Sequence, residues 1–239
     1  VHNSRVMISN TDIELSTALK ISDASVIAKN VNIEYVETSS CDGGNCDQSL
    51  VIVSSTSNFT WSEGQGKNGR ADHGGLIIAD SSNIKLIDVT ITGCHSKKDG
   101  GAIYLKKGSS LELTHCSLLE NKALGGNGGC IAVTGLSSLK SEYGLFKDNE
   151  ASSGDGGAVF VATNTHANFF KTIFSGNSAL KGNGGALMLA SGAHSTCDSI
   201  SANNNVAESG GVLFSYTSIL ISDSIMAGNK ATMRGGALR

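Results

Sequence analysis

The sequence predicts an all-β protein, a right-handed parallel β-helix in which each coil of about 25–28 residues contributes three short strands. Three observations support this prediction: a repeat at nearly constant spacing, short runs of alternating apolar residues, and the absence of proline from all 239 residues. Repeats of this length are typical of solenoids, and alternation at a period of two is typical of strands. Because proline cannot donate to a hydrogen-bond ladder, its absence is expected where nearly every amide pairs with a neighbouring strand.

Each repeat begins with a pair of glycines and ends with an asparagine. The glycine pairs begin at Gly74, Gly100, Gly128, Gly156, Gly184, Gly210 and Gly235. The asparagines follow at a constant distance from the second to fifth of these glycines, and at a slightly shorter distance from Gly210, at Asn121, Asn149, Asn177, Asn205 and Asn229. We therefore divide the solenoid into irregular N-terminal coils over 1–73 and regular coils over 74–239, where the sequence stops inside a repeat and is expected to be part of a longer protein.

Within one repeat, the apolar residues form three alternating runs. In the coil that starts at Gly100 these runs contain Ile103 with Leu105, Leu111 with Leu113, and Cys116 with Leu118. None of them reaches helical length, and the glycine and serine content argues against tandem helical hairpins. The pattern of leucine-rich repeats is also absent. Each run is therefore predicted to be one strand that pairs with its copies in the coils above and below.

The glycine pairs and the asparagines mark two corners of the coil. Asp99, Asn127, Asp155 and Asn183 precede glycine pairs, and we interpret Asp/Asn-Gly-Gly as a tight bend built from residues that accept a positive φ. At the other corner the five repeat asparagines are expected to lie in register. Their side-chain amides would then hydrogen-bond to one another and to the turn backbone, as a buried structural ladder.

These motifs resemble the repeats of a known family. Gly-Gly-Ala followed by Ile, Val or Leu begins at Gly100, Gly156, Gly184 and Gly235, and Phe-x-x-Asn begins at Phe146 and Phe174. The combination is similar to the GGA[ILV] and FxxN repeats of the chlamydial polymorphic outer membrane proteins, and the resemblance covers residues 74–239. It implies an autotransporter passenger, or a related extracellular repeat protein, that acts at the cell surface, chiefly in adhesion.

The irregular part of the chain carries separate candidate sites. Residues 54–73 are polar and glycine-rich, and we predict that this segment leaves the stack as a loop. It contains the sequon Asn58-Phe59-Thr60, so Asn58 is a candidate glycan acceptor if the chain passes through a eukaryotic secretory pathway. Cys41 and Cys46 flank a short Asp-Gly-Gly-Asn loop and are predicted to form a disulfide in an oxidising compartment.

The other four cysteines, Cys94, Cys116, Cys130 and Cys197, fall at apolar, small or asparagine positions of the repeat. They are predicted to be buried thiols that pack as small hydrophobes. His166 and His194 occupy the same position in two successive repeats and are expected to stack on the surface. Two interpretations remain open for them: a pair of solvated imidazoles, or a pair that senses pH or binds a metal ion.

One row of apolar residues is predicted to point outward from the first strand of successive coils. If Ile103 and Leu105 point inward, the positions between such pairs point outward and stack. We call this row the outer stripe; it contains Ile78, Tyr104, Ala132, Phe160, Met188 and Phe214. Either loops of the longer coils cover the stripe, or it is a lateral contact with another copy or a larger partner.

Composition and charge spacing limit the functions to be considered. A net charge of −3 with 16% charged residues gives no basic footprint for nucleic acid, and no apolar run is long enough for insertion in a membrane. Along the outward face of the second strand no two carboxylates stack, and so no catalytic residues are predicted. No metal centre and no cofactor are predicted either.

We therefore expect a non-catalytic extracellular or cell-surface rod, structural or adhesive, that acts by display or by lateral assembly. Its expected partners are a protein or a second copy along the outer stripe, a cell-surface receptor, or a glycan. The alternative is a carbohydrate-active β-helix, similar to a polysaccharide lyase or hydrolase, with a site outside the regular repeats. Such a site would lie around Trp61, Asp72 and His73.

Overall fold

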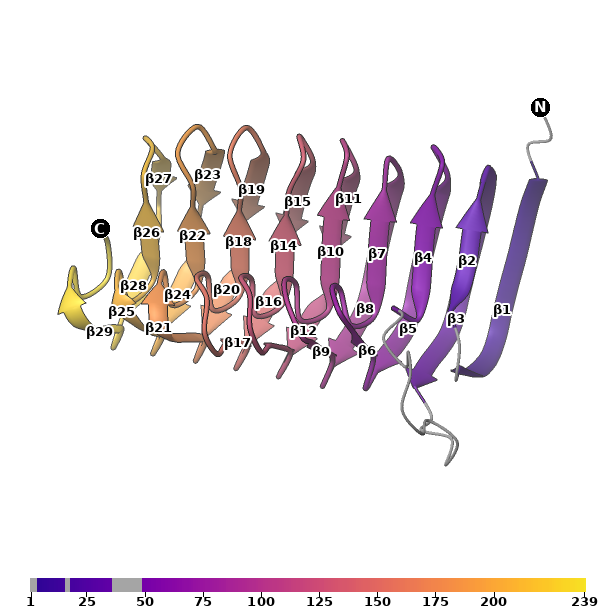
Figure 1. Ribbon diagram of the computed structural model, residues 1–239, viewed down its shortest axis with the longest axis horizontal. Coiled ribbons are helices and arrows are strands. Elements are labelled where there is room, and N and C mark those ends of the chain that lie inside the picture. The colour runs from indigo at the N-terminus through magenta and orange to yellow at the C-terminus, as the bar shows by residue number, and fades with distance from the viewer. Residues whose placement is uncertain (1–3, 16–17, 36–48) are drawn as a thin grey trace.

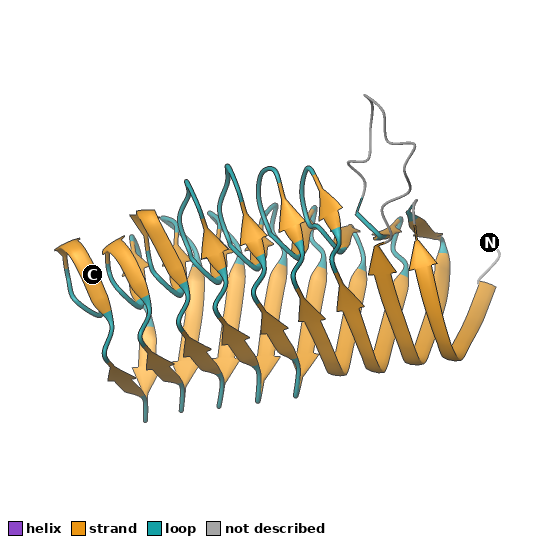
Figure 2. Ribbon diagram, turned by 90° about the horizontal axis from the view of Figure 1, so that it is seen from below, coloured by secondary structure: helices purple, strands orange, loops and turns teal. Residues whose placement is uncertain are grey.

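A computed structural model describes residues 4–15, 18–35 and 49–239 and shows a parallel β-helix (Figure 1). The coils stack in order from the N-terminal to the C-terminal end of an elongated solenoid, and the paired strands of the described residues are parallel (Figure 2). The predicted fold class is thus confirmed. In these ranges no helix has the length and apolar character needed to span a bilayer. Cys41 and Cys46 lie outside the described residues.

Three sheets run along the solenoid. The first contains β1 (Ser4–Leu15), β3 (Ala24–Tyr35), β5 (Asn58–Lys67), β8 (Asn83–Thr92), β11 (Ser110–Thr114), β12 (Ser117–Leu119), β15 (Ser138–Glu142), β16 (Leu145–Lys147), β19 (His166–Phe170), β20 (Ile173–Ser175), β23 (His194–Asp198), β24 (Ser201–Asn203), β27 (Leu220–Ser222) and β28 (Ile225–Ala227). The second contains β2 (Leu19–Ser22), β4 (Val51–Ser54), β7 (Ile77–Asp80), β10 (Ile103–Lys106), β14 (Ile131–Val133), β18 (Val159–Val161), β22 (Leu187–Leu189) and β26 (Leu213–Ser215). The third contains β6 (Arg70–Ala71), β9 (His95–Ser96), β13 (Lys122–Ala123), β17 (Glu150–Ala151), β21 (Ser178–Asn183), β25 (Val206–Ser209) and β29 (Lys230–Arg234).

The three strands predicted for one coil are present as β10, β11 and β12, and the structure adds the two-residue β13 as a fourth. Like residues pair between coils: Ile103 pairs with Ile131, and Leu111 pairs with Leu139. All four are buried, so the alternation along each strand fills a core that continues from coil to coil. In the N-terminal coils the two strands of the first sheet are merged into one long strand, as in β3 and β5.

The structure corrects the prediction that residues 54–73 leave the stack as a loop. Half of this segment is the ten-residue strand β5, which pairs with β3 on one side and β8 on the other. Phe59 and Trp61 are buried in the core, and the Trp61 indole N–H donates to the Val31 carbonyl at 3.0 Å. The sequon residue Asn58 begins the strand and is exposed, and its Oδ1 accepts a hydrogen bond from Asn83 Nδ2 at 3.1 Å.

The glycines that suggested a loop have a packing role instead. A Cβ atom on Gly64 would lie 2.1 Å from the Val31 carbonyl oxygen and 2.3 Å from the Trp61 indole nitrogen. A Cβ atom on Gly66 would lie 2.4 Å from a methyl carbon of Leu76. All three distances are too short for any real contact. The glycines therefore make room for the largest side chain of the core.

The two glycines of each repeat pair have different roles. The first adopts a left-handed conformation, as at Gly100 with φ of 65°, which glycine accepts without steric strain. Except at the last pair, the second lies against the next coil: a Cβ on Gly101 would be 2.0 Å from the Gly129 carbonyl oxygen. The aspartate and asparagine residues before the pairs are not among those with positive φ, which corrects our interpretation of that corner.

The repeat asparagines form one continuous hydrogen-bond ladder. Its fully buried members are Asn121, Asn149, Asn177 and Asn205, and it continues to Asn229. At each step one side-chain oxygen accepts two bonds from the asparagine a coil earlier. Asn177 Oδ1 accepts from the Asn149 backbone N–H at 3.1 Å and from its Nδ2 at 2.9 Å. Asn177 Nδ2 in turn donates to the Phe146 carbonyl at 3.0 Å, which links the two ends of the Phe-x-x-Asn motif between coils.

We predict that Asn177→Leu destabilises the solenoid far more than a surface substitution does. The change removes the acceptor of two Asn149 donors and the donor to the Phe146 carbonyl, all in the core. Since each unsatisfied buried group costs about 1–3 kcal/mol, the free energy of unfolding should fall by about 3 kcal/mol or more. Urea denaturation followed by circular dichroism measures this fall.

The matched control is Asn168→Leu, on the exposed face of β19, where the side chain accepts only from Thr196. We expect that variant to lose less than about 1 kcal/mol, as surface changes usually do. Equal losses in the two variants would show that the ladder contributes no more to stability than a surface amide.

Candidate interaction surface

The structure places the outer stripe in register on the outward side of the second sheet. Its members pair in the order Ile78, Tyr104, Ala132, Phe160, Met188 and Phe214. Ala132, Met188 and Phe214 are buried, and the other three are half-buried. The chain itself supplies the cover: the His73 ring lies 4.6 Å from the Tyr104 ring, and Tyr216 lies 5.0 Å from Phe214. Little of the stripe is thus left as free apolar surface.

A second polar ladder, which the sequence analysis missed, fixes the turns before the glycine pairs. Asp99 Oδ1 accepts from the Asn127 backbone N–H at 2.8 Å, and Asn127 Oδ1 accepts from the Asp155 N–H at 2.9 Å. Asp155 Oδ1 accepts from the Asn183 N–H at 2.7 Å. Acid and amide alternate, so no two carboxylates are adjacent. The constant spacing of these side chains along the sequence is the signal that sequence reasoning could have used.

The residues suggested for a carbohydrate-active site do not gather around a common space. Trp61 is buried in the core, so its ring offers no platform for a sugar. His73 and Asp72 lie in the turn before β7, where His73 Nδ1 is 3.5 Å from Asp99 Oδ2 and Asp72 is 3.9 Å from Lys98. Burial lowers the pKa of His73, against the opposing effect of the Asp99 charge. Across the described ranges, no group of three or more His, Cys, Asp or Glu side chains could hold a metal ion.

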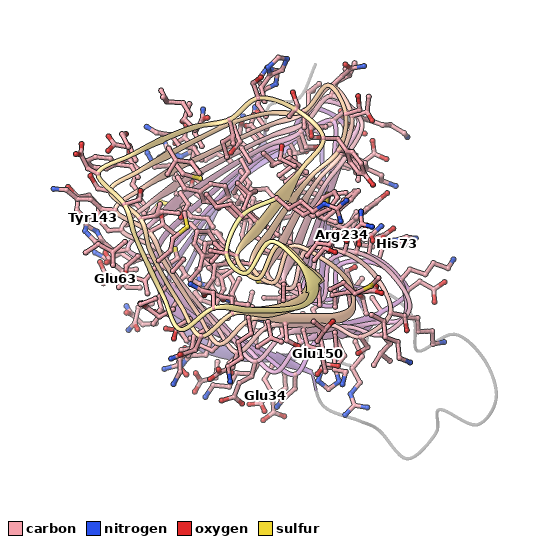
Figure 3. All side chains as sticks on the ribbon, turned by 90° about the vertical axis from the view of Figure 1, so that its left-hand side faces the viewer. Glu34, Glu63, His73, Tyr143, Glu150 and Arg234 are labelled. Carbon is pink, nitrogen blue, oxygen red and sulfur yellow. The ribbon has the colours of Figure 1, made fainter. Side chains whose placement is uncertain are left out.

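A row of outward side chains follows the corner between the two strands of the first sheet. We call it the corner row; it contains Glu63, Asp88, His115, Tyr143, Lys171, Ser199 and Asp223. Every member has a φ between 46° and 56°, and all except the half-buried Ser199 are exposed. In a view along the solenoid axis, Glu63 and Tyr143 point outward at the same corner of the cross-section (Figure 3).

The left-handed conformation of the corner row is a source of strain. For residues other than glycine it costs about 1–2 kcal/mol, and bulky residues such as tyrosine rarely adopt it. At the next corner of the coil the left-handed position is occupied by glycine in several coils, at Gly93, Gly176 and Gly228. Within the described residues the corner row contains no glycine at all. Strain of this kind is concentrated at functional sites in proteins.

The centre of the corner row is an aromatic cluster, which we define as His115, Tyr143 and Phe170. The His115 and Tyr143 rings stack with centroids 4.8 Å apart and an interplanar angle of 25°. Phe170 meets Tyr143 edge-on at 5.8 Å, and Lys171 Nζ lies 5.3 Å from the Tyr143 centroid. Tyr143 is 44% exposed. Rings with a polar tip beside a cation are well suited to partners that need both stacking and hydrogen bonding.

The four cysteines of the described residues are free and buried. Burial raises the pKa of Cys94 and of Cys197 to about 12, and raises that of Cys130 well above its usual range. Cys94 occupies the first position of the asparagine ladder, where its backbone N–H donates to Asn121 Oδ1 at 3.0 Å. These thiols pack as small apolar groups, and none of them is part of a candidate surface.

Comparison with known proteins identifies one repeat of the chain. Residues 171–189 match the model of the Chlamydia polymorphic membrane protein repeat. The match runs from the strand β20, through the ladder residue Asn177, to the glycine pair at Gly184 and the strand β22. No curated protein and no solved structure matches the chain. The matched segment thus contains both the Phe-x-x-Asn and the Gly-Gly-Ala-Leu motifs in the geometry described above.

We predict that Phe160→Ser combined with Phe214→Ser destabilises the fold and leaves the oligomeric state unchanged. Both rings pack on the outward face of the second sheet, and Phe214 is 6% exposed beneath Tyr216 and Arg239. Truncating a buried aromatic ring costs about 3–5 kcal/mol, and Phe160 should contribute less because it is half-buried. Thermal denaturation of the parent chain and the double variant measures the loss of stability, and sedimentation velocity measures their oligomeric state. Loss of a concentration-dependent association at unchanged stability would instead identify the stripe as a lateral contact.

We also predict that the thiols of Cys94, Cys130 and Cys197 do not react with iodoacetamide at pH 8 in the native protein. Iodoacetamide reacts with the thiolate. Because burial raises the pKa of these three thiols, they stay protonated at pH 8. The three thiols should react fully once the chain is unfolded in guanidinium chloride. Peptide mass spectrometry before and after unfolding measures the labelling, and native labelling of any of the three would contradict their burial.

Proposed function

We propose that the chain is a non-catalytic, surface-displayed rod that binds partners on cells, in the manner of an autotransporter passenger. The match of residues 171–189 to a repeat of polymorphic membrane proteins supports a location at the cell surface. A stacked solenoid supports display, because it holds side chains of successive coils in fixed rows over its whole length. The corner row is the observation that carries the binding role.

The corner row combines three properties of a contact surface. It is exposed, it is rigid because its backbone amides pair between coils, and it repeats at the coil spacing of about 4.8 Å. The His115 N–H, for example, donates to the Glu142 carbonyl at 3.0 Å, and the Tyr143 N–H donates to the Phe170 carbonyl at 3.0 Å. Rigid aromatic side chains bind with little loss of conformational entropy, so even weak contacts along such a row support adhesion.

Display through the corner row is favoured over lateral assembly through the outer stripe. Half of the stripe's members are buried, whereas Tyr143 and Lys171 are exposed. The partner we propose is a receptor or glycan on another cell. Mixed charges in the row, from Asp88 to Lys171, favour a partner with both donors and acceptors over a uniformly charged one.

We predict that His115→Gly, Tyr143→Gly and Lys171→Gly together abolish adhesion without unfolding the solenoid. Glycine relieves about 1 kcal/mol of backbone strain at each position, which offsets the lost stacking of about 0.5–1.5 kcal/mol. The thermal midpoint should therefore stay within a few degrees of the parent chain. Adhesion is measured by counting beads coated with the purified chain that remain on cultured epithelial cells, and we expect at least a tenfold fall.

The matched control is Glu120→Gly with Asp148→Gly, at the next corner of the coil. These residues are also exposed and also left-handed, with φ of 55° and 54°. We expect this variant to adhere like the parent chain. Equal adhesion of the corner-row variant and the control would show that the corner row is not the binding surface. A parent chain that does not adhere would overturn the proposed function.

A further inference from the structure

A pair of histidines lies on the outer face of the first sheet, away from the corner row. His166 is the first residue of β19 and His194 is the first residue of β23, and the two positions are direct partners in the parallel pairing. Their rings stack with centroids 5.1 Å apart and an interplanar angle of 20°. Both residues are exposed. Of the histidines in the described ranges, these two are the pair whose rings face each other.

The backbone beneath the two imidazoles is held firmly. Between the strands, Asn168 Oδ1 accepts from the Thr196 backbone N–H at 3.2 Å and from its hydroxyl at 2.9 Å. On the inner side, the Ser195 hydroxyl donates to the Ala167 carbonyl at 2.6 Å. In contrast, no hydrogen bond or ion pair of the described residues engages either imidazole ring. The imidazole rings can therefore rotate about their side-chain bonds while the backbone beneath them stays in place.

Two imidazoles at this separation are suited to a divalent transition-metal ion. Imidazole nitrogen is a preferred ligand of zinc, copper and nickel. A zinc ion with Zn–N distances of about 2.0–2.1 Å and tetrahedral angles needs its two nitrogens about 3.3 Å apart. Facing rings 5.1 Å apart reach this distance by tilting toward each other, a rotation that exposed side chains make within nanoseconds.

The surroundings supply room and oxygen atoms for the remaining ligands. The two imidazoles line a shallow surface depression together with Asn168, Thr196 and Ser218. Their side-chain oxygens, or water, can occupy positions that the two nitrogens leave open. We propose that His166 and His194 form a two-histidine site for a zinc-class ion, which ties the coil of β19 to the coil of β23. This site is independent of the proposed adhesive function, because it shares no residue with the corner row.

Titration calorimetry of the purified chain with zinc chloride, in a buffer that does not chelate zinc, tests the proposal. We expect one equivalent of zinc to bind per chain below millimolar concentration, and less tightly than at a structural site with four protein ligands. His166→Ser and His194→Ser should each weaken the binding at least tenfold, because each removes one of two ligands. Serine is a safe replacement for the fold, since Ser138 and Ser110 hold the same outward position in the two preceding coils.

The matched control is His115→Ser, which removes an exposed imidazole that stacks on Tyr143 and not on another histidine. It should bind zinc like the parent chain. A second readout is thermal denaturation: zinc at 100 times its dissociation constant should raise the midpoint by roughly 5 °C in the parent chain, because a ligand that binds only the folded state stabilises it. The midpoint of His194→Ser should rise by about half as much or less at the same zinc concentration, because its binding is at least tenfold weaker.

Three outcomes would overturn the site. The first is the absence of zinc binding at millimolar concentration. The second is binding that survives both His166→Ser and His194→Ser, which would assign the zinc to other groups. The third is an equal loss of affinity in the His115→Ser control, which would indicate unspecific binding to surface histidines.

Discussion

The hydrogen bond from each repeat asparagine to the asparagine of the next coil is the interaction on which the rest of the structure depends. An amide buried in the core, such as Asn149, is satisfied only if the coil above and the coil below lie at the correct height. The glycine pairs enforce the same height from the opposite side, since Gly101 leaves no space for a Cβ against the next coil. In the regular coils, one ladder and one close contact thus set the register of all three sheets.

A fixed register inside the solenoid creates ordered rows outside it. Every outward position repeats at the coil spacing, whether it carries apolar, aromatic or ionisable side chains. The outer stripe, the corner row and the pair His166–His194 all follow from this geometry, and they differ only in what covers them. Half of the stripe's members are buried, whereas the other two rows are exposed except for the half-buried Ser199. Stacking is common to every row, so it does not identify a functional row. Exposure is the property that distinguishes the rows that can contact a partner from the row that packs within the chain.

The sequence predicted the solenoid and its register because glycine pairs and asparagines are the residue types that each corner requires. It failed over residues 54–73, where glycines that resemble loop residues make room for Trp61 and Leu76 in a strand. It also missed β13, whose two residues are too few to alternate. The sequence did not reveal the corner row for a different reason: its members share a backbone conformation, but they belong to six different residue types. The chemistry of each side chain can be read from the sequence, but the left-handed backbone conformation of these residues cannot.

The strain of the corner row is tolerated because the stack determines the backbone there. In the middle of the row the amide of the left-handed residue is bonded to the following coil, as in Tyr143 to Phe170 and Lys171 to Asp198. A tyrosine in a free turn would relax to negative φ, since the left-handed form costs about 1–2 kcal/mol. In the solenoid, such relaxation would break the hydrogen bond to the following coil. The asparagine ladder that holds the core in register thus also keeps large side chains at a corner where an isolated turn would accept little except glycine.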